Sequence, residues 1–142
     1  MKIFKTFILV SLFVFFSLPL KGEEIIIECV WEGQTSIHKW EKSSSGKPQI
    51  FYKRKGKWLK WCVSGKDEDW TYTRTIKYLN KRGECFTIGS DDLNDVNFEK
   101  ITESFIDFEI LKREIQTKLK TTFPDGEETN KSFSRNYKCK KL

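Results

Sequence analysis

The 142-residue chain lacks several motifs that mark common classes of enzyme. It has a single histidine, His38, so two imidazoles are not available for a metal site. It contains no Gly-x-Ser-x-Gly sequence, the turn that presents the nucleophile of many serine hydrolases. Its four cysteines include no Cys-x-x-Cys pair, which disfavours a zinc ribbon or a thioredoxin-type redox centre. These absences predict no catalytic residues, no metal and no cofactor, and therefore a protein that is not an enzyme.

A long apolar run is also absent. The most apolar stretch, residues 7–18, is shorter than the roughly 20 residues that a membrane-spanning helix needs. Two lysines precede it, and a basic start before a short apolar run is typical of a secretory signal peptide. We expect a signal peptide over residues 1–22 and one mature domain over 23–142, with no stable membrane span after cleavage and a periplasmic or secreted location. Leu20 is large for its position before the cut, so an uncleaved anchor stays open.

Positive charge exceeds negative charge only slightly. The full chain carries +6, and removal of Lys2, Lys5 and Lys21 would leave 23 basic and 20 acidic residues, a net charge of +3. Only five of the basic residues are arginines, whose planar fork suits phosphate. A nucleic-acid-binding domain usually concentrates more positive charge than this. We therefore expect no nucleic acid as a partner.

All four cysteines lie in the predicted mature domain. An even number of cysteines behind an export signal predicts two disulfides in an oxidising compartment. Cys29 lies in the first predicted strand and Cys139 in the last, so a Cys29–Cys139 bridge would close the fold if these strands pair. Cys62 and Cys85 would then form the second bridge. Four cysteines allow three pairings, and the sequence alone does not choose between them.

Alternating polarity recurs along residues 23–142 and predicts β-strands. The most regular run, residues 70–78, places its aromatic residues on one face and its threonines on the other. Pro124-Asp125-Gly126 is the strongest turn signal, since proline presets φ and glycine tolerates a positive φ. The pattern predicts an all-β fold: a compact antiparallel meander barrel or sandwich of about eight to ten short strands, stabilised by disulfides.

Residues 104–120 fit two patterns. Apolar residues recur at spacings of three and four, as on one face of a helix, and polarity also alternates, as in strands. The alternation continues to Phe123, which favours two strands with a break near Arg113-Glu114. Just before this segment, residues 90–95 read as an acidic loop.

The stretch from Ile50 to Val63 holds the richest candidate surface. Two runs of β-favouring residues flank Lys55-Gly56, where a positive φ at Gly56 would close a hairpin. The chain is 15% aromatic, so Trp31, Trp40, Trp70 and Tyr72 could join the hairpin in lining a groove for a sugar, a peptide or another apolar ligand. The alternative is that the aromatic residues form the core and the lysines keep the hairpin soluble. The candidate binding residues are Tyr52, Lys53, Arg54, Lys57, Trp58 and Trp61.

Three other features are explained more simply than by chemistry. His38 reads as an ordinary surface or half-buried histidine. The acids at 91–99 lack the glycine and the spacing of a calcium loop. Asp107 and Glu109 share one strand face, which water would see if their apolar neighbours form the core.

The cysteine-bearing first strand behind an export signal, with the loop Ser44-Ser45-Gly46, resembles the small periplasmic lysozyme inhibitors. That resemblance implies a compact antiparallel barrel with an inhibitory loop. We expect first a monomeric, non-enzymatic exported domain that binds an unknown protein or small-molecule ligand through the aromatic and basic hairpin. The alternative is a secreted inhibitor of a hydrolase. Binding predicts a concave aromatic pocket, whereas inhibition predicts a protruding loop at residues 43–48 and no pocket.

Overall fold

The computed structural model describes residues 22–44, 46–67 and 70–142. The expected signal peptide lies outside the described residues, apart from Gly22. The described chain forms ten β-strands, which confirms the all-β prediction. The strands are β1 (Glu23–Trp31), β2 (Gln34–Lys42), β3 (Gln49–Arg54), β4 (Lys57–Lys60), β5 (Gly65–Asp67), β6 (Trp70–Leu79), β7 (Arg82–Leu93), β8 (Val96–Asp107), β9 (Lys112–Thr122) and β10 (Glu128–Lys141).

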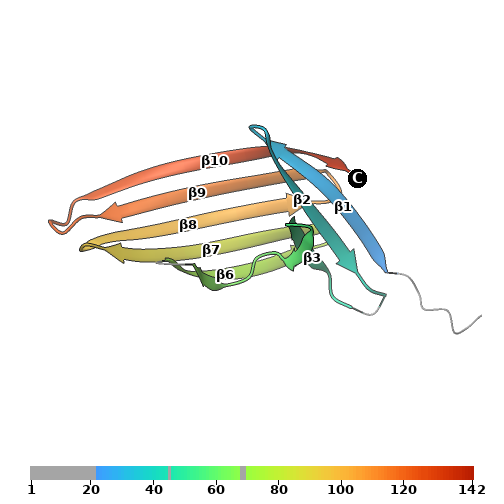
Figure 1. The fold of residues 1–142 in the computed structure, drawn as a ribbon, viewed down its shortest axis with the longest axis horizontal. Helices are drawn as coiled ribbons and strands as arrows, with labels where there is room; N and C mark the ends of the chain where they lie inside the picture. Colours follow the sequence, from blue (N-terminus) through green and yellow to red (C-terminus); the bar gives the residue numbers. More distant parts are fainter. Residues whose placement is uncertain (1–21, 45, 68–69) are drawn as a thin grey trace, which may run out of the picture.

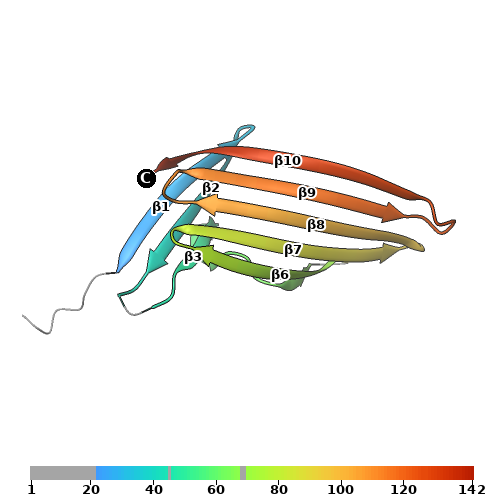
Figure 2. The ribbon, with the colours of Figure 1, turned by 180° about the vertical axis from the view of Figure 1, so that it is seen from behind.

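All ten strands belong to one antiparallel sheet, in the order β4-β3-β2-β1-β10-β9-β8-β7-β6-β5. The first and last long strands meet where β1 pairs with β10, over Ile27–Val30 and Lys138–Lys141. Strands β6 to β10 lie side by side, and β1 to β3 cross them obliquely at one end (Figures 1 and 2). The expected compact barrel or sandwich is therefore a single curled sheet, a half-barrel that starts at β4 and stops at β5.

The strands from β6 to β10 are 10 to 14 residues long, so the expectation of short strands is wrong for these five. The expected acidic loop at 90–95 is mostly strand, because β7 runs on to Leu93. Asn94 and Asp95 adopt φ values of 50° and 64° and make a two-residue turn of the kind that matches strand twist. Exposed residues such as Ser90 and Asp92 face water from within the strand, so their polarity did not mark a loop.

Residues 104–120 form two strands, as the alternation predicted, but the break lies at 108–111 and not near Arg113-Glu114. The Asp107 carboxylate sets this turn by accepting hydrogen bonds from the backbone N–H groups of Glu109 (2.8 Å) and Ile110 (3.1 Å). Leu111 then adopts a φ of 56°. Phe108 is buried in the core, while Ile110 is 64% exposed. The alternation of apolar residues at 106, 108 and 110 therefore does not mark one strand face beyond Asp107.

The core lies at one end of the half-barrel, where β1 to β3 cross the longer strands. Buried side chains from β1 to β3 pack against Ile106 and Phe108; they are Ile27, Cys29, Trp40 and Ile50. Two disulfides reinforce this end: Cys29 is bonded to Cys139 across the β1–β10 seam, and Cys62 is bonded to Cys85. The other end of the sheet carries few buried side chains and is exposed on both faces.

Gly83 permits the close approach of the two parts of the core. A Cβ built on Gly83 would overlap Ile50 Cδ1 and lie 2.9 Å from Trp61 Cζ3. We expect Gly83→Ala to lower the free energy of unfolding by about 1–3 kcal/mol, since the core would have to shift. Gly89→Ala on the same strand is the matched control, because its added Cβ meets Trp70 only at 3.5 Å. Urea denaturation would measure the free energy of unfolding of both variants. Equal losses in the two variants would show that close packing at Gly83 is unimportant.

Candidate functional site

The face of β6 to β10 that carries the core is concave, and strand register identifies its residues. Cross-strand partners lie on the same face of a sheet. Beyond the core, each successive row of partners along β6 to β10 leads toward the open end of the half-barrel. The rows are Ile76-Cys85-Ser104-Ile115-Arg135, Arg74-Thr87-Thr102-Thr117-Phe133 and Tyr72-Gly89-Lys100-Leu119-Lys131.

Three adjoining hollows make this concave face a continuous trough. The base pocket, about 330 Å³, lies where β2 and β3 face the long strands and includes His38 and Arg113 in its lining. An apolar pocket of about 300 Å³ lies toward the open end and is lined by Trp70 and Phe133 among others. A third hollow of about 350 Å³ runs along Tyr72 beside them. The base and apolar pockets share Ile115 as a wall, so a single ligand can occupy both.

The base pocket contains a buried polar network. Arg113 Nη1 donates a hydrogen bond of 2.8 Å to Ser36 Oγ, and His38 Nε2 lies 3.1 Å from the same oxygen. His38 is only 2% exposed, and burial, with a smaller contribution from the Arg113 charge, lowers the pKa of His38 to about 3. The imidazole is therefore neutral at physiological pH. The expectation that His38 is a surface or half-buried residue is wrong.

The Arg113 guanidinium is the charge at the bottom of the trough. It stacks on the Tyr137 ring at 4.2 Å from the ring centroid. Burial lowers the pKa of Arg113 from its ordinary value; Tyr137 opposes this, and the charge of Arg135 adds to it. An arginine pKa starts so high that the group stays cationic. Arg135 stacks on Trp31 at 4.6 Å and lines the adjoining apolar pocket, whereas Arg74 lines the base pocket together with Arg113.

The structure divides the predicted hairpin site between two faces. Tyr52 and Trp61 line the base pocket and are half-buried. Trp58 is also half-buried but lies on the opposite face of the hairpin, where Lys39 Nζ is 4.8 Å and Lys53 Nζ 5.7 Å from the centroid of its ring. Arg54 and Lys57 are exposed partners beside the two-residue turn, in which Gly56 has the expected positive φ of 75°.

Most of the trough was not among the predicted site residues. Trp70 and Tyr72 were recognised as aromatic residues that could line a groove, but Arg113, Phe133 and Arg135 were not. Their signal is weak: they alternate with polar residues as in any half-exposed strand. Only the pairing of β9 with β10 brings Arg113, Phe133 and Arg135 to one face.

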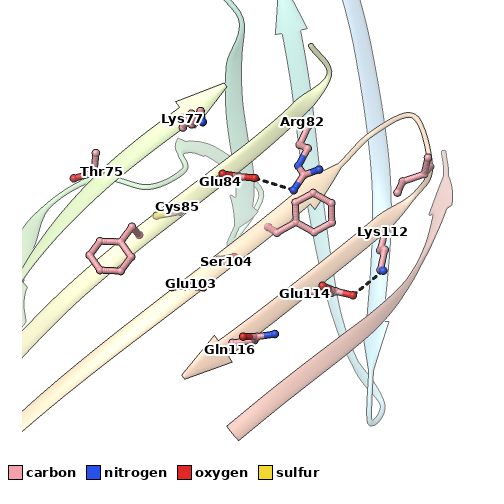
Figure 3. A pocket seen from close by; sticks show the side chains of 13 residues that line it. Thr75, Lys77, Arg82, Glu84, Cys85, Glu103, Ser104, Lys112, Glu114 and Gln116 are labelled. Atoms are coloured by element: carbon pink, nitrogen blue, oxygen red, sulfur yellow. Dashed lines mark hydrogen bonds and ion pairs between the residues drawn. The ribbon is translucent and has the colours of Figure 1, made fainter. Parts of the chain in front are cut away.

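A second groove lies on the opposite, convex face and differs in its electrostatics. It has a volume of about 700 Å³ and contains Phe86 and Phe105. Four of its charges are paired, Arg82 with Glu84 and Lys112 with Glu114, each at 2.8 Å (Figure 3), and the two others, Lys77 and Glu103, are of opposite sign. Paired charges do not require a charged ligand, so this groove gives less indication of a partner than the concave trough.

Comparison with known proteins identifies no relative: no family model, no curated protein and no solved structure matches the chain. Among the residues that the structure describes, no helix is long and apolar enough to cross a membrane. The same part of the chain contains no group of three or more His, Cys, Asp and Glu side chains arranged to hold a metal ion. The trough geometry is therefore the basis for a functional proposal.

Proposed function

We propose that this protein is an exported, non-enzymatic binding domain that holds a ligand with an apolar part along its concave trough. The observation that carries this proposal is the exposure of large apolar side chains on the concave face. Phe133 is 53% exposed there, beside the half-exposed rings of Trp70 and Tyr72. Concave sites lined by aromatic residues and a few polar groups are typical of small-molecule binding.

The disulfides support an exported location. Both of them fit an oxidising compartment, and we propose the periplasm or the exterior of the cell. The domain acts as a monomer, and its β3–β4 hairpin contributes Tyr52 and Trp61 to the closed end of the trough. The alternative of a hydrolase inhibitor called for a protruding loop without a pocket. The trough is lined by β2 and β3 near the N-terminus and by β9 and β10 near the C-terminus. Such a pocket favours ligand binding over hydrolase inhibition.

A neutral fluorescent probe, N-phenyl-1-naphthylamine, tests the proposed trough without depending on charge. We expect binding that Thr117→Trp weakens at least tenfold, because Thr117 lies on the floor of the trough beside Thr102, with their hydroxyl oxygens 3.3 Å apart. Thr73→Trp is the matched control, since Thr73 faces solvent on the convex side. Fluorescence titration and circular dichroism would be measured for both. Unchanged binding by Thr117→Trp, or equal loss in both variants, would refute binding in the trough.

A further inference from the structure

The arginine side chains on the two faces of the sheet differ in whether they have acidic partners. On the convex side of β7 to β10, ion pairs neutralise Arg82, Lys112, Lys120 and Lys140, whereas Lys118 and Lys138 have no carboxylate within 4.0 Å among the described residues. On the concave side, Arg113 and Arg135 have no carboxylate within 4.0 Å among the described residues, and each stacks on an aromatic ring instead. Over Trp70–Tyr137, the concave rows contain five cations and a single acid, Asp91; the cations are Arg74, Lys100, Arg113, Lys131 and Arg135.

Arg113 is the most unusual of these cations because it is largely buried. One of its donors is used by Ser36, but its Nε atom is buried and has no hydrogen-bond partner within the described part of the chain. The same holds for Nδ1 of His38, whose ring lines the same pocket. Arg135 is paired with Ile115, two residues along β9 from Arg113, so the two like charges are diagonal neighbours.

A buried cation without a counter-charge is costly to fold around. Such a cost is typical of sites that are completed by a ligand, where function outweighs stability. An anionic group in the base pocket would accept hydrogen bonds from the guanidinium and reduce the repulsion between Arg113 and Arg135. The base pocket, at about 330 Å³, is large enough for a phosphate, sulfate or carboxylate group.

The trough continues from this cationic end into an apolar end. Ile115 and Leu119 on β9, with Phe133 and Trp70, line the apolar pocket, and Lys100 and Arg135 also border it. Leu119 is six residues from Arg113 on the same strand, which is about 20 Å. One leaflet of a bilayer has a hydrocarbon depth of about 15 Å, so the trough accommodates one extended acyl chain and its headgroup.

From these observations, and resting on the proposed function, we infer that the trough binds a single-chain amphiphile with an anionic headgroup. The headgroup lies against Arg113 at the closed end of the trough, beside Arg135 and Ser36. The hydrocarbon chain extends over Ile115 toward Leu119, Phe133 and Trp70. A neutral sugar would leave the Arg113 charge uncompensated, and a cationic amphiphile would be repelled by it.

Calorimetric titration with dodecyl phosphate, below its micelle-forming concentration, tests this inference. We expect dodecyl phosphate to bind at least tenfold more tightly than dodecyltrimethylammonium, which has the same chain and the opposite charge. Inorganic phosphate alone is expected to bind more weakly than dodecyl phosphate, since it lacks the chain. Equal affinity for the two amphiphiles would overturn the headgroup assignment, and equal affinity for inorganic and dodecyl phosphate would overturn the chain assignment.

Arg113→Gln separates a ligand-binding arginine from a structural one. We expect it to weaken dodecyl phosphate binding by about 10- to 100-fold. Lys118→Gln is the matched control, because Lys118 is an exposed cation on the opposite face of the same strand. Without ligand, Arg113→Gln should melt at the same temperature as the wild type or higher, since it removes an uncompensated buried charge. A lower melting temperature with unchanged affinity would show that Arg113 is structural and would refute its role in binding.

The neutral probe distinguishes failure of this inference from failure of the proposed function. If N-phenyl-1-naphthylamine binds in a Thr117-dependent way but dodecyl phosphate shows no preference over its cationic counterpart, the trough is a binding site of different specificity. If neither compound binds, both the proposed function and the anionic-amphiphile assignment are wrong.

Discussion

Removing the Cys29–Cys139 disulfide by Cys29→Ala with Cys139→Ala is expected to lower the free energy of unfolding by about 5 kcal/mol. The bridge closes a loop of 110 residues, and in the chain-entropy model the stabilisation grows with loop length, reaching about 4.7 kcal/mol near 100 residues. It also joins β1 to β10 where the two strands pair over only four residues of each. Because typical domains are stable by about 5–15 kcal/mol, this loss is a large part of the total.

The second disulfide provides the control. Cys62 and Cys85 are 23 residues apart, so Cys62→Ala with Cys85→Ala should lower the free energy of unfolding by about 3 kcal/mol. Urea denaturation of the two double variants at equal pH compares them directly. A loss for the Cys29–Cys139 variant no larger than that for the Cys62–Cys85 variant would contradict the importance of closing the terminal seam.

Acid is expected to destabilise the fold through His38. The histidine pKa is lowered to about 3 in the folded state, against about 6.5 in the unfolded chain. Between these values the unfolded state binds a proton that the folded state does not, so stability is complete above about pH 6.5 and falls as the pH decreases. The slope is about 1.4 kcal/mol per pH unit, which amounts to about 3 kcal/mol between pH 7 and pH 4.

His38→Gln isolates this contribution, since glutamine is neutral throughout and keeps a polar group beside Ser36 Oγ. Carboxylates that titrate in the same range affect both proteins alike. We expect the free energies of unfolding of wild type and variant, measured in urea at pH 7, 5.5 and 4, to diverge by about 3 kcal/mol in favour of the variant at the lowest pH. Parallel pH curves would show that His38 takes up a proton in the folded state as readily as in the unfolded one.

The local pattern of the sequence predicted much of the secondary structure. Alternation over 70–78 and 115–123 marks parts of β6 and β9, because each strand has a more apolar face. Lys55-Gly56 and Pro124-Asp125-Gly126 mark turns, and Gly126 has a φ of 87°. Strand ends were predicted less well. Both faces of β7 and β8 meet water at their far ends, so polar residues there do not distinguish a strand from a loop.

The candidate site was only partly predictable for a different reason. Aromatic content identified Trp61, Trp70 and Tyr72 as possible groove residues, and the structure places them along the trough. The clustered lysines of the hairpin give a stronger sequence signal than Arg113 and Arg135, whose sequence neighbours are typical of exposed strands. Lys53 Nζ lies 5.7 Å from the centroid of the Trp58 ring on the far face of the hairpin, and Lys53 also lines the base pocket.

The sequence by itself determined that this protein is a β-structure held by disulfides, because strand periodicity, turn residues and cysteine number are local or compositional properties. Tertiary structure alone decided which faces meet. The sheet curls without closing and brings Ser36 of β2 to within 2.8 Å of Arg113 of β9, although 77 residues separate them. A buried arginine can be recognised as such only when the elements that cover it are in place, since burial is a property of packing and not of the residue.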